Sequence, residues 1–180
     1  MSWITGKIRL FRASCYVLCL CAGGALAAGT EGTDAQVKAA FVFNFMRYVD
    51  WPEGVPGPAE PLVVCQTRSA NAALGAIEGR QVKGRELRLR QVENDPAGCH
   101  VLVFGEGDAG SPLLRRAQGR PILTVGEGWA FLDEGGVIAL AVVDGKMAFG
   151  ANLESARRSS LRLGSQMLKL ARRIVDASVR

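Results

Sequence analysis

The chain has 180 residues and a formal net charge of +5, with 48% hydrophobic and 22% charged residues. This length supports one domain with a substantial core, and the balanced composition argues against disorder, collagen-like repeats and coiled coils. The basic residues and the five cysteines are unevenly distributed, so both totals change once a processed segment is set aside.

Residues 1–27 have the composition of a secretory signal peptide. Three basic residues and no acid occur in the first dozen positions, and an apolar stretch that ends in alanines follows. This stretch, about 14 residues, is shorter than the roughly 20 needed to cross a bilayer, which disfavours an uncleaved membrane anchor. We therefore predict cleavage after Ala27 or Ala28 and an exported domain over residues 28–180.

Removal of the signal peptide takes away three of the 22 basic residues and none of the 17 acidic ones, so the basic character is largely a targeting feature. The exported part keeps two cysteines, Cys65 and Cys99. An even pair in an oxidising compartment suggests a disulfide, and the alternative is two buried thiols that never meet. In the entropy model, closing this loop of about 34 residues restricts the unfolded chain by roughly 3.5 to 4 kcal/mol.

The exported part opens with a predicted helix over residues 34–48. Apolar residues recur there at helical spacing, and Pro52 ends the pattern. We expect the buried face to carry Val37, Ala40, Phe41, Phe45 and Tyr48, widened by Phe43 and Met46.

Strands and helices then alternate. The predicted elements are strands over residues 62–65, 86–92, 100–104, 122–125, 137–142 and 146–149, and helices over 69–77, 112–118, 153–158 and 165–175. Continuous apolar runs such as HVLVF at 100–104 are typical of strands that are covered on both faces. The alternation predicts an α/β fold with a mixed, largely parallel β-sheet and helices packed on its faces, in a single compact domain.

A glycine-rich loop at residues 105–110 has the spacing G-x-G-x-x-G between a predicted strand and a predicted helix, which is typical of dinucleotide-binding folds. However, Glu106 and Asp108 place two carboxylates where a pyrophosphate would bind, and Pro112 stands at the start of the helix. The pattern therefore favours a loop at a strand end over a nucleotide site.

Cys99 and His100 could in principle form a thiolate beside a base. Adjacent residues of a strand point to opposite faces, however, so these side chains are not expected to meet. His100 is the only histidine, and one histidine with two cysteines gives no recognisable metal-ligand spacing. We therefore predict no catalytic residue, no metal and no cofactor.

The C-terminal residues 157–180 contain seven basic residues and one acid. A helix over 165–175 would bury Met167, Leu168, Ala171, Ile174 and Val175 and leave the cations outside. The candidate partner-binding residues are Arg157, Arg158, Lys169, Arg172 and Arg173. Such a face suits an acidic partner or anionic lipid, and the alternative is a solvated face with cations near the helix C-terminus. Nucleic acid is disfavoured because no aromatic residues are interleaved there.

The segment VKAAFVFNFMRYVDWP at residues 37–52 resembles the opening helix signature of the YfiR family of periplasmic proteins. Shorter matches follow in the same order along the chain: CHVLVF at 99–104, PILTV at 121–125, GGVI at 135–138, Phe149 with Asn152-Leu153, and SQMLKLA at 165–171. The similarity covers about residues 35–173. Gly126-Glu127 and residues 148–151 depart from the more usual family residues.

The resemblance implies an α/β fold without an active site and a periplasmic repressor of a membrane-bound diguanylate cyclase. In the family, the repressor binds the cyclase's periplasmic sensor domain, and an outer-membrane lipoprotein or redox stress relieves the inhibition. Cyclic di-GMP then rises and promotes biofilm and exopolysaccharide formation.

The resemblance also places Cys65 and Cys99 where the family has a disulfide, whereas a second family disulfide has no cysteines here. It is compatible with a homodimer. The alternative function is a periplasmic small-molecule-binding sensor module that passes its signal to a membrane receptor.

Overall fold

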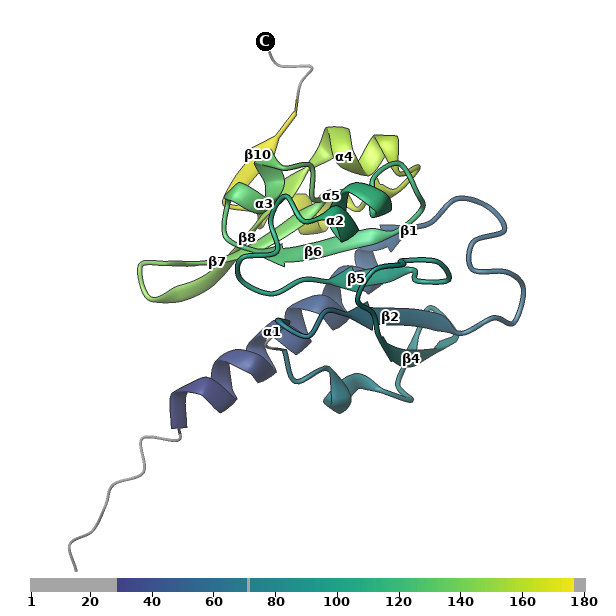
Figure 1. The fold of residues 1–180 in the computed structure, drawn as a ribbon, viewed down its shortest axis with the longest axis horizontal. Coiled ribbons are helices and arrows are strands. Elements are labelled where there is room, and N and C mark those ends of the chain that lie inside the picture. The colour runs from purple at the N-terminus through teal and green to yellow at the C-terminus, as the bar shows by residue number, and fades with distance from the viewer. Residues whose placement is uncertain (1–28, 71, 177–180) are drawn as a thin grey trace, which may run out of the picture.

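The computed structural model describes residues 29–70 and 72–176 (Figure 1). The signal peptide predicted for residues 1–27 lies outside this part of the chain. None of the helices in the described part is both long and apolar enough to cross a membrane.

A sheet of eight strands forms the centre of the described part, in the order β10-β8-β7-β6-β5-β2-β4-β3. The strands are β2 (Leu62–Gln66), β3 (Gln81–Val82), β4 (Arg85–Gln91), β5 (Val101–Val103), β6 (Leu123–Glu127), β7 (Ile138–Val143), β8 (Lys146–Asn152) and β10 (Arg173–Val175). The pairs β7–β8 and β3–β4 are antiparallel and the other neighbours are parallel. The predicted α/β fold with a mixed, largely parallel sheet is confirmed.

Helix α1 (Gly29–Tyr48) crosses one face of the sheet (Figure 1). Its buried side chains are Ala39, Val42, Phe45 and Met46, which join a core with apolar residues of β2, β5 and β6. The predicted buried face was therefore partly wrong, because Val37, Ala40 and Tyr48 are exposed and Phe41 is half-buried. Apolar residues occur on most sides of this helix, so their spacing is compatible with more than one buried face. In the structure the sheet packs against a face next to the predicted one.

Helices α2 (Pro112–Ala117) and α3 (Ala130–Asp133) cover the opposite face. Leu113, Leu114 and Phe131 pack there against Leu102 and Phe104 in a second buried core. Because side chains alternate along a strand, the residues on either side of Leu102 in β5 face the α1 core instead. The result is three layers, with helices on both faces of the sheet.

Shorter elements complete the fold. The 3₁₀ helix η1 (Leu74–Ile77) packs beside α1, α4 (Leu153–Arg158) follows β8, and α5 (Ser165–Leu168) contributes Met167 to the α1 core. A separate two-stranded ladder joins β1 (Val49–Asp50) to β9 (Arg162–Leu163) in antiparallel register.

The helix predicted over residues 69–77 is confined to the single turn of η1. Two features account for the difference. The hydroxyls of Thr67 and Ser69 bond to the loop after β5 rather than to a following helix, and Gly75 lowers helix propensity within the segment.

The helix predicted over residues 165–175 is also wrong beyond Leu168. The chain turns and forms β10, in which Arg173 pairs with Gly150 and Val175 with Asn152. Gly150 permits this approach, since a Cβ there would lie 3.0 Å from the Arg173 carbonyl oxygen. Short apolar segments satisfy helical and strand spacing equally, and the open edge of β8 decides the outcome.

Candidate functional site

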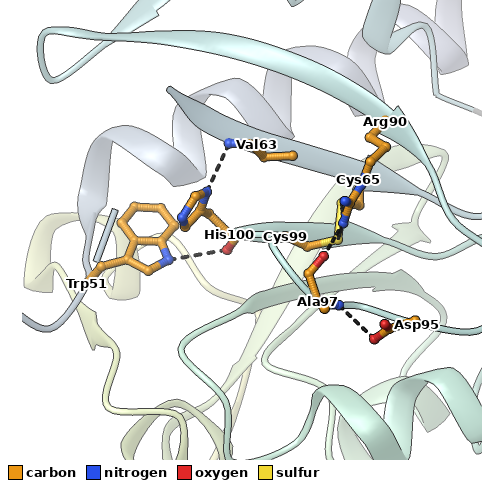
Figure 2. The surroundings of a disulfide bond; sticks show 8 residues. All are labelled: Trp51, Val63, Cys65, Arg90, Asp95, Ala97, Cys99 and His100. Carbon is orange, nitrogen blue, oxygen red and sulfur yellow. Dashed lines mark hydrogen bonds between the residues drawn. A yellow bond between two sulfur atoms is a disulfide. The ribbon is translucent and has the colours of Figure 1, made fainter. Parts of the chain in front are cut away.

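Cys65 of β2 and Cys99, which precedes β5, form a disulfide in the structure, with Cα atoms 5.7 Å apart (Figure 2). Both residues are buried. The pair of separate buried thiols is therefore excluded, and the bond joins two adjacent parallel strands across a chain separation of 34 residues. A thiol nucleophile at Cys99 is incompatible with this state, because catalysis would require a free thiolate.

His100 points away from Cys99, as strand alternation predicts (Figure 2). Its Nδ1 accepts a hydrogen bond from the Val63 backbone N–H at 3.0 Å, and its carbonyl oxygen accepts one from the Trp51 indole at 3.2 Å. Burial lowers the pKa of His100, and the nearby Arg85 adds to this while Glu60 opposes it. A neutral imidazole that accepts a backbone hydrogen bond fits a structural role at the start of β2 and β5.

Arg90 of β4 covers the disulfide, a contact that the sequence did not indicate. Its Nη2 atom lies 3.1 Å from the Cys99 Sγ and 3.5 Å from the Cys65 Sγ, and it also donates to the Ala97 carbonyl (Figure 2). In this position the Arg90 side chain shields the disulfide from solvent on the side of β4.

The glycine-rich loop lies at the usual ligand position of a doubly wound sheet. The five parallel strands lie in the order β4-β2-β5-β6-β7. From β2, the chain first adds β4 on one side and then adds β5, β6 and β7 on the other. The order therefore reverses between β2 and β5. Ligands of such folds bind in the crevice outside the carboxyl ends of the strands at this switch point. Thr67 and Ser69 follow the end of β2 at this point, and the loop 105–110 follows the end of β5.

In this chain a carboxylate of the loop itself bonds to the polar donors of the crevice, on the wall of a pocket of about 330 Å³. Asp108 Oδ2 accepts hydrogen bonds from Thr67 Oγ1 at 2.8 Å, Ser69 Oγ at 2.5 Å and the Gly105 backbone N–H at 3.0 Å. These are donors that could hold an oxyanion of a ligand. The strand ends also pack closely, since a Cβ on Gly105 would lie 2.0 Å from the Ser69 carbonyl oxygen.

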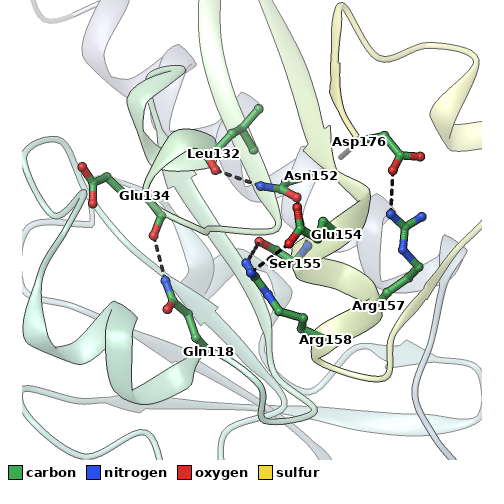
Figure 3. A network of polar contacts seen from close by, with 9 residues as sticks. All are labelled: Gln118, Leu132, Glu134, Asn152, Glu154, Ser155, Arg157, Arg158 and Asp176. Atoms are coloured by element: carbon green, nitrogen blue, oxygen red, sulfur yellow. Dashed lines mark hydrogen bonds and ion pairs between the residues drawn. The ribbon is translucent and has the colours of Figure 1, made fainter. Parts of the chain in front are cut away.

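The five candidate partner-binding cations do not share one helix face. They are distributed over α4, the turn after α5, and β10. Within the described residues, four of these cations form ion pairs. Figure 3 shows Arg157–Asp176 at 2.6 Å and Arg158–Glu154 at 3.1 Å. The other two pairs are Arg172–Asp144 at 3.7 Å and Arg173–Asp133 at 2.7 Å. The helix predicted over residues 165–175 ends at Leu168, before Lys169, Arg172 and Arg173, and the ion pairs reduce the net charge of this region. Partner binding by these residues remains a prediction.

Asn152 organises the region between β8 and α4. Its Oδ1 caps α4 by accepting from the Ser155 backbone N–H, and its Nδ2 donates to the Leu132 carbonyl at the end of α3 (Figure 3). Asn152 is buried with both groups satisfied. The helix-start pattern Asn-Leu-Glu-Ser could have indicated the cap, but not the contact with α3.

An apolar groove lies between α1 and α5. It has a volume of about 410 Å³ and is lined by Phe41, Asn44, Phe45, Tyr48, Phe149, Gln166, Met167 and Leu170. The Phe45 and Phe149 rings are 5.0 Å apart and form its base, while Tyr48 is 38% and Leu170 74% exposed. We call this surface the aromatic groove. It contains no charged lining residue, so it suits an apolar surface of another molecule.

The sequence profile of a family described as YfiR/HmsC-like matches residues 35–172. The match begins in α1 and ends just before β10, so it includes both walls of the aromatic groove and the two cysteines of the disulfide.

Proposed function

The chain belongs to the YfiR/HmsC-like family, and we propose that it is a periplasmic regulatory protein that binds and represses the periplasmic sensor domain of a membrane-bound diguanylate cyclase. Repression lowers cyclic di-GMP and thereby biofilm and exopolysaccharide production. The observation that carries the proposal is the family match over most of the described chain.

Three structural features support a binding role in an oxidising compartment. Cys99 is held in a disulfide, as expected for an exported protein. His100 accepts a backbone hydrogen bond and is partly desolvated, and Asp108 is bonded within its own loop. The polar residues that the sequence raised as candidates for chemistry thus have structural partners.

The aromatic groove supplies a contact surface for the sensor domain. Leu170 and Tyr48 stand at its rim, where they present apolar area that folding alone does not bury. Burial of such area drives protein association, and aromatic anchors contribute most of the binding energy of many interfaces. In the proposal, an outer-membrane lipoprotein relieves repression by sequestering the protein.

Gene deletion with measurement of cyclic di-GMP tests the repressor function. We expect cyclic di-GMP and biofilm mass to rise on deletion and to return to normal with the wild-type gene. Unchanged levels on deletion, in cells that normally express the protein, would refute repression.

Complementation with Leu170→Asp tests the groove. We expect it to fail, because a carboxylate at the rim opposes apolar contact. Ile174→Asp is the matched control, since Ile174 is 49% exposed in β10 and does not line the groove. Equal complementation by both variants would remove the groove from the proposal while leaving repression intact.

A further inference from the structure

The hairpin of β7 and β8 extends beyond the rest of the sheet (Figure 1, at the left). Strand β6 pairs with β7 only as far as Leu140, which lies opposite Glu127. On the other side, β10 pairs with β8 only at residues 150–152. Residues 141–149 therefore form a two-stranded ribbon, closed by the turn at Asp144 and Gly145.

One edge of this ribbon is open at Val142. A two-residue turn makes Val143 and Lys146 a hydrogen-bonded pair, so alternation directs the backbone groups of Leu140 and Val142 away from β8. The Leu140 carbonyl accepts from the Gly128 N–H at 2.8 Å, which is the last contact on that side. In the described part of the chain no strand pairs with Val142 at this edge, and its side chain is 64% exposed.

A groove of about 260 Å³ separates this edge from α1. Its lining includes the apolar residues Leu140, Val142 and Met147 of the hairpin. We call this surface the hairpin groove. Natural proteins commonly protect an open strand edge with lysine, proline or a covering element. The edge residues 141–143 are Ala-Val-Val, which offer no such protection.

The charged residues of the hairpin groove are mostly acidic. Lys38 of α1 and Glu127 of β6 form an ion pair at 2.7 Å, with side chains only 14% and 20% exposed, so these two charges offset each other. Asp34 and Glu106 also line the groove and are exposed. Neither forms an ion pair within 4.0 Å among the described residues, and the groove carries an excess of negative charge.

We propose that the hairpin groove binds an extended segment of a partner protein that carries aliphatic residues and lysine or arginine on the same face. The segment adds a strand to the open edge at Val142. Because side chains of a strand alternate between its two faces, residues at every second position of the segment enter the groove, where the aliphatic ones contact Val142 and Met147 and the cations reach Asp34 and Glu106. A second copy of this chain fits less well, because pairing two β7 edges would bring like carboxylates together. This surface is separate from the aromatic groove, and the inference does not depend on repression of a cyclase.

The first experiment uses a (Lys-Thr-Val-Thr)2 peptide, labelled with fluorescein at its N-terminus and amidated at its C-terminus, in which lysine and valine share one face of a strand. Its anisotropy is measured with residues 28–180 of the chain. We expect saturable binding that weakens at least about tenfold in the double variant Asp34→Lys with Glu106→Lys, and that falls when salt rises well above about 0.1 M. The matched control, Glu53→Lys with Glu78→Lys, adds the same charge at exposed positions outside the groove and should change affinity by less than about twofold. Equal weakening in both double variants would show non-specific charge attraction and overturn the site.

The second experiment separates strand addition from charge attraction. Val142→Pro removes an edge N–H that the hairpin does not use, so the protein should keep its thermal midpoint while losing the peptide. A (Glu-Thr-Val-Thr)2 peptide should not bind, because its carboxylates would face Asp34 and Glu106.

Undiminished binding to folded Val142→Pro would overturn strand addition. If that variant does not fold, the charge variants decide the proposal. A wild-type dimer that dissociates in Val142→Pro and does not bind the peptide would assign the edge to a second copy and refute the proposed partner.

Discussion

Two positions along the carboxyl ends of the parallel strands differ in how their polar groups are satisfied. In the crevice between β2 and β5, the hydroxyls of Thr67 and Ser69 and a backbone N–H all bond to Asp108. In the hairpin groove beside β6 and β7, the carboxylates of Asp34 and Glu106 face outward and a strand edge is open. At the place where doubly wound folds usually hold small ligands, these donors are thus bonded from within the chain, beside a pocket of about 330 Å³. The neighbouring groove instead offers a surface for another chain.

The disulfide should have the largest effect on this comparison, because it joins the two strands that flank the crevice. Replacement of Cys65 and Cys99 by alanine should lower the free energy of unfolding by about 3.5 to 4 kcal/mol, from the greater freedom of the unfolded chain. Urea denaturation of the variant and of the wild type in reductant would measure this. An unchanged urea midpoint in both would show that the bond does not stabilise the fold.

Gly105→Ala should force apart the ends of β2 and β5 at the crevice. The new Cβ would lie 2.0 Å from the Ser69 carbonyl oxygen, so the backbone after β2 must move, and overpacking of this kind costs about 3 kcal/mol. Gly75→Ala is the control, because a Cβ there meets nothing within 4 Å. Thermal unfolding of both variants should show a large loss for the first alone, and comparable losses would contradict the close packing.

Asp108→Ala should remove the internal anion while leaving the strand ends in place. Two hydroxyls and one backbone N–H lose their acceptor, which we expect to cost about 2 kcal/mol. Urea denaturation beside Glu106→Ala provides the contrast, since Glu106 is exposed in the same loop and its loss should change stability by less than about 0.5 kcal/mol. Similar losses in the two variants would mean that the hydrogen bonds of Asp108 do not stabilise the strand ends.

The smallest expected effect concerns pH at the opposite end of β2 and β5. Burial lowers the pKa of His100 in the folded state, so the unfolded chain binds the proton more readily. This contribution to stability is present above the unfolded pKa and is lost as pH falls through it toward the folded value. Denaturation at pH 7.5 and 5.5 should show the loss in wild type and a smaller loss in His100→Gln. Equal pH dependence would assign it to other groups.

The fold and the disulfide were predictable because they depend on strong local signals. The apolar run at residues 100–104 contains β5, which is buried on both faces, and the two cysteines in the part predicted to be exported leave one partner each. The signature at residues 37–52 likewise identified the family that the profile match shows.

The orientation of α1 and the C-terminal region were less predictable, because they depend on tertiary contacts. Phe41 and Tyr48 are aromatic like the buried Phe45. Only the position of the sheet determines that Phe45 is in the core while Phe41 and Tyr48 are not. Ile174 and Val175 form a strand because β8 offers an edge. The contact between Arg90 and the disulfide joins residues that no local pattern relates.

The ladder between β1 and β9 has a kinetic consequence. Val49 pairs with Leu163 and Asp50 with Arg162, so more than a hundred residues must be positioned before two short strands can meet. The entropy cost of closing a loop of this length must be met before the β1–β9 contact stabilises the chain. We therefore expect this ladder to form late in folding. Phe45 and Phe149, at the base of the aromatic groove, are almost as far apart in the chain. We therefore expect the groove to form late in folding and to be lacking in partially folded chains.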